Sequence, residues 1–165
     1  MSEKIDPVRK TDDEAIALTT KLVESNRYAA LGVLEPETGV PLVSRVAVAW
    51  SPDTGLFFAA SDLSLHSKAL LEDGTCSLLL GEPGKGDGLA HPRITLVATT
   101  QRLPNSVENR AQLREAFLKA HPKAELYIDF ADFGFYPLAV ARAYLNGGFG
   151  KAYHLNEDDL AFIGG

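Results

Sequence analysis

The chain has 165 residues, of which 45% are hydrophobic and 23% are charged, and its formal net charge is −6. This length suits one domain with a single core, and the composition excludes a disordered chain, a collagen-like repeat and a coiled coil. The negative charge argues against binding to nucleic acid or to an anionic membrane, because both favour positively charged partners. An anionic ligand would therefore require a local cluster of cations.

Cys76 is the only cysteine. The chain therefore has no internal disulfide and no CxxC pair for zinc or redox chemistry, and a cytoplasmic location is expected. No apolar run follows the charged residues 1–10, so we expect no signal peptide. The longest apolar runs are too short to span a bilayer.

The first predicted element is an amphipathic helix that ends near Ser25. Thr11 and Glu14 form a capping box with Thr11 as the N-cap, and apolar residues follow at helical spacing. The period then changes to two, and clusters of Pro, Gly and Asp separate the runs. We expect antiparallel strands over 28–34, 42–50 and 56–61.

The remaining elements follow from the same signals. A helix is expected over 65–71 with Gly74 beyond its end, followed by strands over 75–80 and 93–103 on either side of a Gly/Pro loop at 81–92. The next helix is capped by Asn105 or Ser106 and stops at His121-Pro122. Strands over 133–145 and 152–155 follow, and Asn156 then caps the start of a last helix.

This pattern indicates a mainly β protein, a β-barrel with flanking helices. We expect a six-stranded antiparallel Greek-key barrel, and a sandwich is the alternative. Residues 1–155 would form the barrel with its N-terminal helix. Residues 156–165 would begin a C-terminal helix or a truncated extension.

Several familiar motifs are absent from the sequence. The loop at 81–88 is rich in glycine, but it has neither the phosphate-loop spacing nor the dinucleotide-binding spacing. The four histidines form no helical pair for a metal, so we expect no structural metal site. No Gly-x-Ser-x-Gly elbow is present for a serine hydrolase.

A set of polar and cationic residues is spread over several strand ends. The strand at 42–50 carries Ser44 and Arg45, the helix at 65–71 begins near His66 and Lys68, and Arg93 opens a later strand. In a barrel these segments can converge at one rim, where a helix N-terminus would also favour an anion. The cluster would then hold a phosphate monoester. The alternative is that Arg45 and Lys68 are ordinary surface charges.

The chain resembles the FMN-binding split-barrel proteins related to pyridoxamine 5′-phosphate oxidase, and in particular their haem-utilisation (HugZ-type) branch. The resemblance covers almost the whole chain. The stretches that carry it are PLVSRV (41–46), SDLSLHSKAL (61–70), CSLLLGEPGKGD (76–87), HPRITL (91–96), HPKA (121–124) with FADF (130–133), and NGGFGKA (146–152).

The resemblance implies an FMN-dependent oxidoreductase that forms a homodimer with FMN at the subunit interface. Lys68 would be the main cation for the phosphate, and the residues from Ala59 to Ser61 would border the flavin ring. The cofactor-binding residues that the resemblance implies are Ser44, Arg45, Val46, Ala59, Ala60, Ser61, His66, Ser67, Lys68, Arg93 and Thr95. No catalytic residue is implied.

Two departures from the family leave other functions open. The Arg-rich C-terminal motif with which the oxidase grips its substrate phosphate does not follow Ala152, which disfavours oxidation of pyridoxamine phosphate. The haem-degrading members of the family supply an iron-ligating His from a segment beyond the Gly-Phe-Gly strand, and no matching segment follows that strand here. A haem-binding or haem-degrading protein is the alternative function, with the nearby His154 as the candidate iron ligand. A flavin-binding module without enzymatic activity is the third hypothesis.

Overall fold

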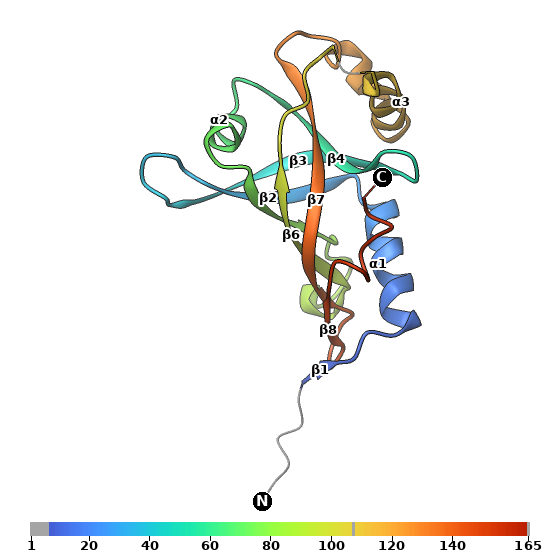
Figure 1. Ribbon diagram of the computed structural model, residues 1–165. Helices are drawn as coiled ribbons and strands as arrows, with labels where there is room; N and C mark the ends of the chain where they lie inside the picture. The colour runs from blue at the N-terminus through green and yellow to red at the C-terminus, as the bar shows by residue number, and fades with distance from the viewer. Residues whose placement is uncertain (1–6, 107, 165) are drawn as a thin grey trace, which may run out of the picture.

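The computed structural model describes residues 7–106 and 108–164, and six of its strands close into an antiparallel barrel (Figure 1). The barrel closes because β7 pairs with β4 along 133–137 and with β6 along 138–146. The six strands are β2 (Tyr28–Leu34), β3 (Pro41–Ser51), β4 (Gly55–Ser61), β5 (Thr75–Leu80), β6 (Arg93–Thr100) and β7 (Phe133–Asn146). The predicted six-stranded barrel is confirmed, and closure excludes the sandwich.

The connectivity is the expected Greek key. Strands β2, β3 and β4 form a meander, and β5 returns to pair with β2, which gives the spatial order β5-β2-β3-β4. Strand β8 (Ala152–Leu155) extends the sheet from β7, and β1 (Val8–Arg9) pairs with β8 in parallel. The pairing of β1 was not predicted.

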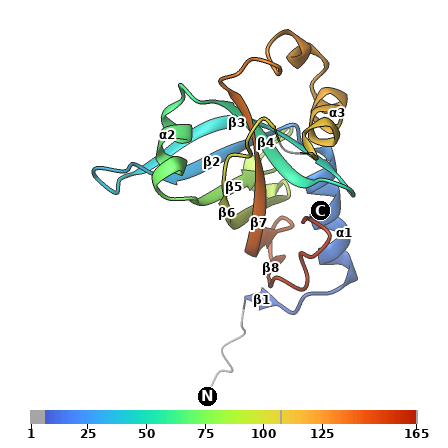
Figure 2. The same ribbon diagram turned by 45° about the horizontal axis from the view of Figure 1, so that its top comes forward.

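In the described part of the chain, three α-helices surround the barrel. Figures 1 and 2 show α1 (Asp13–Ser25) and α2 (Leu65–Glu72) on opposite sides and α3 (Arg110–Ala120) towards one end. Two 3₁₀ helices, η1 (Gly88–Ala90) and η2 (Pro122–Leu126), lie in the connections. Over residues 7–106 and 108–164, no helix is both long and apolar enough to cross a membrane.

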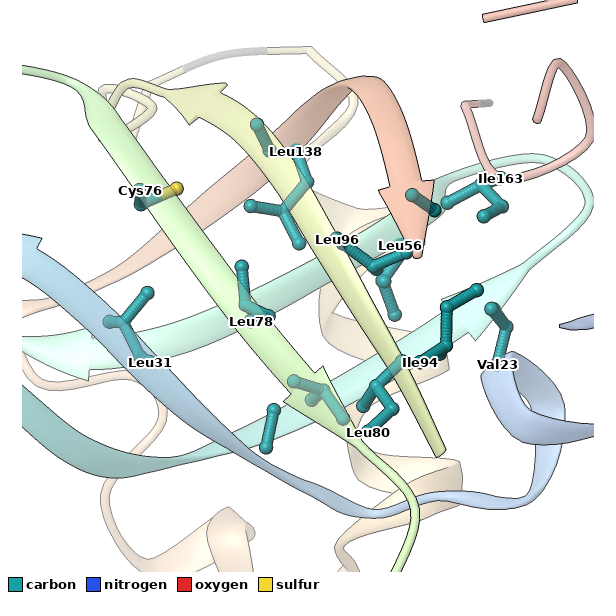
Figure 3. Packing of buried hydrophobic residues seen from close by; sticks show 14 of the residues in the cluster. Val23, Leu31, Leu56, Cys76, Leu78, Leu80, Ile94, Leu96, Leu138 and Ile163 are labelled. Carbon is teal, nitrogen blue, oxygen red and sulfur yellow. The ribbon is translucent and has the colours of Figure 1, made fainter. Parts of the chain in front are cut away.

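The core fills the barrel because every second strand residue is apolar and points inward. Leu31, Leu78 and Leu96 are register partners on β2, β5 and β6, and all three are buried (Figure 3). Each such side chain contributes about 1.5–3 kcal/mol on burial. A second cluster lies under α3, where Phe117 packs with Phe57 and Phe135.

The N-cap of α1 is Asp12, not the predicted Thr11. Asp12 Oδ1 accepts a hydrogen bond from the backbone N–H of Ala15 at 2.9 Å, and the Thr11 hydroxyl donates to the His154 carbonyl at 3.2 Å. Glu14 does not reach back to the cap, because its carboxylate pairs with Lys151 Nζ at 2.8 Å. Thr11 and Asp12 are both residue types that cap helices well. Asp12 is the cap because the Thr11 hydroxyl is bonded to a carbonyl of β8.

The segment between β6 and α3 also differs from the prediction. The strand ends at Thr100 instead of residue 103, and Arg102 beyond it binds Asp62. Asn109, not Asn105 or Ser106, precedes α3. Asn105 instead donates its side-chain amide to the Ala131 carbonyl at 3.2 Å. A longer connection between β6 and α3 results.

The predicted helix after Asn156 is wrong, because residues 157–163 form turns. Asn156 and Asp159 do exchange hydrogen bonds between side chain and backbone at 3.0 Å, as a helix cap would. The chain then folds back, and Leu160 and Ile163 enter the core. The Ile163 carbonyl accepts from the backbone N–H of Leu56 at 2.8 Å, which anchors the turn to β4.

Candidate functional site

The first turn of α2 lies against β3. The Oγ atom of Ser44 is 2.9 Å from Nδ1 of His66. Partial burial lowers the pKa of His66 below its ordinary value of 6.5, because desolvation disfavours the charged imidazolium. Near neutral pH this pair therefore offers uncharged hydrogen-bonding groups.

Arg45 lies on the face of β3 opposite to Ser44, because successive side chains of a strand alternate. Its register partners on the neighbouring strands form a line across the outside of the barrel. We call this line the outer row, and it contains, in order, Arg45, Ala30, Leu79, Thr95, Tyr144 and His154. Three residues singled out from the sequence, Arg45, Thr95 and His154, therefore lie in one row that passes around the outer wall of the barrel.

This wall is apolar and exposed at the Arg45 end. A hollow of about 570 Å³ lies there, lined by Arg45, Tyr28, Val43, Leu79 and residues 81–83 among others. The side chains of Tyr28, Val43 and Leu79 are all exposed. Within the described chain, the Arg45 guanidinium makes no ion pair or hydrogen bond, so it can bind an anion.

The His154 end of the wall carries an aromatic and cationic group. The rings of Tyr144 and His154 meet edge to face with centroids 4.9 Å apart, and Arg142 Nε donates to the Tyr144 hydroxyl at 3.1 Å. Among residues 7–106 and 108–164, the His154 ring nitrogens have no hydrogen-bond partner. The same residues contain no group of three or more His, Cys, Asp or Glu side chains that could hold a metal.

Four of the predicted cofactor-binding residues have their side chains engaged within the protein. Val46 and Ala60 point into the barrel core, and Ala59 packs in the cluster under α3. The Ser61 hydroxyl donates to Asp132 Oδ2 at 2.8 Å. Cofactor contacts through these side chains stay a prediction.

The other predicted residues do not form a single cluster. Ser67 is buried on the inner side of α2, and Lys68 is exposed with no ion pair in the described residues. Arg93 Nη1 donates to the carbonyls of Leu89 at 3.0 Å and His91 at 3.3 Å, so it braces the loop after β5. The structure thus joins Ser44 to His66 and places Arg45 and Thr95 in the same outer row. The guanidinium of Arg93 is bonded to loop carbonyls instead.

The sequence reasoning missed the apolar part of the wall, namely Tyr28, Val43, Leu79 and Tyr144. A signal was present, because β2 has the sequence YAALGVL, which is apolar on both faces. A strand with one face in solvent normally alternates with polar residues. Such a strand indicates a face that something else covers.

The closed barrel with its flanking helices defines a split-barrel protein. The family described as "CREG, beta-barrel" matches residues 10–160, and the chain belongs to this family.

A curated relative from Arabidopsis thaliana, the non-canonical heme oxygenase HOZ, chloroplastic, is 37% identical over 120 residues. The match covers 67% of this chain and 36% of the relative, so the chain spans about a third of that protein.

Two solved structures are similar over most of the chain. A heme binding protein from Mycobacterium smegmatis has a TM-score of 0.81 at 26% identity, with 92% of this chain and 61% of that chain covered. The protein Atu2129 from Agrobacterium tumefaciens, of unknown function, has a TM-score of 0.77 at 30% identity, with coverages of 94% and 65%. Haem binding thus occurs among proteins with this fold.

Proposed function

We propose that this protein binds haem on the outer wall of its barrel, at the end formed by β7 and β8. The observation that carries the proposal is the outer row, which aligns Tyr144 and His154 on an exposed surface. The names of the Arabidopsis and Mycobacterium relatives, which state haem oxygenase activity and haem binding for those proteins, support it.

The residues at this end fit the chemistry of haem. A porphyrin needs an apolar surface, its propionates need cations, and its iron accepts an imidazole nitrogen. Tyr144 supplies ring surface, Arg142 supplies a guanidinium two residues away on the same strand face, and His154 supplies the imidazole. When bound, haem supplies an iron centre for oxygen chemistry. The chain's own contribution is to orient the imidazole against the Tyr144 ring and to neutralise a propionate.

The Arg45 end of the wall faces away from the His154 end. The two residues are at opposite ends of the outer row, which passes around five strands of the closed barrel, so their side chains point in different directions. A porphyrin bound to His154 would therefore use Arg142 rather than Arg45.

Titration with haem, followed by the Soret band, tests this proposal. We expect a saturable red shift that is absent in His154→Ala. Arg142→Gln should lower the affinity for haem about tenfold, the loss expected for one charge-assisted contact. His91→Ala is the control, because that imidazole bonds to the Lys85 carbonyl within the loop. If His154→Ala binds as the control does, His154 is not the ligand, and an absence of any saturable shift refutes haem binding.

FMN is the second candidate, and it is favoured by the unpaired cations near β3 and α2. Arg45 and Lys68 make no ion pair within the described chain, and the Ser44–His66 pair adds neutral hydrogen-bonding groups between α2 and the face of β3 opposite to Arg45. FMN would supply one- and two-electron transfer, and the chain would hold its phosphate. A second copy of the chain would cover the exposed side chains of Tyr28 and Val43 and complete the site. Flavin binding without turnover would indicate a non-enzymatic module.

A further inference from the structure

A separate hollow lies outside the wall proposed for haem or flavin. It has a volume of about 390 Å³ and lies where the end of α1, the β3–β4 hairpin and α3 meet. Figures 1 and 2 show α1 and α3 on the same side of the barrel, away from α2. This volume is typical of pockets for small molecules.

Two hydrogen bonds to one residue of β3 fix the walls of this hollow. The backbone N–H of Val48 donates to the carbonyl of Arg27, just after α1, at 2.9 Å. The carbonyl of Val48 accepts from His121 Nε2, just after α3, at 2.9 Å. Phe117 also anchors α3 by packing on Phe57. Both sides of the hollow are therefore attached to the same strand, and its width is set by the fold.

Part of the lining is apolar. Trp50, Ala116 and Ala120 line it from β3 and α3. The indole Nε1 of Trp50 donates to the Phe162 carbonyl at 3.3 Å, which orients the ring. A ligand in this hollow would therefore need an apolar group.

The charged part of the lining is cationic on balance. It contains Arg27, Lys119 and one acid, Glu24. Within residues 7–106 and 108–164, the Arg27 and Lys119 side chains form no ion pair or hydrogen bond. The whole chain has a net charge of −6, whereas the charged side chains that line this hollow are two cations and one acid. They provide charge-assisted donors for an anion.

We propose that this hollow binds a small organic anion, a carboxylate attached to an aromatic or branched apolar group. The carboxylate interacts with Arg27 and Lys119, and the apolar group packs against Trp50 and the alanines of α3. An inorganic anion would leave the apolar surface unused. This site is independent of haem and flavin binding, because none of its lining residues belongs to the outer row.

Fluorescence provides a direct test, because Trp50 is the only tryptophan of the chain. The probe is phenylpropionate, and its matched control is phenylpropionamide, which has nearly the same shape but no charge. We expect a saturable change in Trp50 emission with the carboxylate and at least tenfold weaker binding of the amide. Equal binding of the two probes, or no saturable change with phenylpropionate, overturns the proposal.

A pair of double variants separates the local cations from net charge. Arg27→Gln with Lys119→Gln should weaken phenylpropionate binding at least tenfold. Lys21→Gln with Lys123→Gln changes the net charge equally, but these residues do not line the hollow, and this variant should bind as the original protein does. Equal affinities of the two double variants also overturn the proposal.

Discussion

Ser44 and His66 are 22 residues apart in the chain, yet their side chains meet at 2.9 Å and join β3 to the first turn of α2. The contact places an imidazole in a partly buried position next to a single hydroxyl. Because burial lowers its pKa, His66 is stable there in its neutral form. We therefore expect the attachment of α2 to depend on pH.

The free energy of unfolding should depend on pH through His66. The pKa of His66 is lower in the folded protein than its ordinary value of 6.5, so the unfolded chain binds more protons between the two values. The stability that neutral His66 provides is fully present above 6.5 and is lost as pH falls through the folded pKa. Urea denaturation from about pH 5 to about pH 8 should show a smaller stability increase in His66→Gln than in the original protein. His91→Gln is the control. If the free energy of unfolding changes equally little with pH in both variants, His66 is not the origin of the pH dependence.

Replacing Arg45 and Lys68 together should affect a phosphate ligand more than its neutral analogue. We expect Arg45→Ala with Lys68→Ala to weaken FMN binding at least tenfold, because each charge-assisted contact is worth about 1.5–3 kcal/mol. Riboflavin has no phosphate and should lose much less affinity. Titration followed by flavin fluorescence measures both constants, and a similar loss for the two flavins rules out a phosphate role.

The sequence predicted the barrel well because its signals are local. Alternating apolar residues and Gly/Pro turns mark each strand, and an even set of short antiparallel strands favours closure. The outer row could not be predicted, because register decides which outward residues meet and depends on pairing between distant strands. The role of Arg93 was also hidden, since its guanidinium binds carbonyls whose positions depend on the path of the loop. The cap at Asn156 looked helical because caps and turns use the same hydrogen bonds.

Cys76 should be unreactive in the folded protein. The residue is 3% exposed, and burial raises the pKa of its thiol to about 12. The reactive thiolate is therefore scarce at neutral pH, and reagents cannot reach it. A chromogenic disulfide reagent should titrate no thiol in native buffer and one thiol per chain in denaturant. Rapid reaction in native buffer would indicate that β5 opens easily.

The turn that follows β8 should contribute measurably to stability. Ile163 is 0% exposed and packs in the barrel core, so Ile163→Ala leaves a cavity and should cost about 2–4 kcal/mol. Leu126→Ala is the control, because Leu126 is 81% exposed and its loss should cost less than about 0.5 kcal/mol. Urea denaturation measures both values. Similar costs for the two variants would mean that the turn does not pack on the barrel in solution.

Gly134 and Arg102 should be energetically coupled. A Cβ atom at Gly134 would lie 2.5 Å from Arg102 Nε, so Gly134→Ala must displace a guanidinium that donates to Asp62, Ala131 and Leu103.

The expected cost of Gly134→Ala is about 1–3 kcal/mol, the range for lost hydrogen bonds of a charged group. In an Arg102→Ala background this cost should vanish or become a small gain, because alanine is favoured over glycine within a strand. A double-mutant cycle measured by urea denaturation gives the coupling energy directly. Additive effects of the two substitutions would show that moving the Arg102 guanidinium away from Gly134 costs no free energy of unfolding. The contacts of Arg102 would then not stabilise the packing of β7 against the loop after β4.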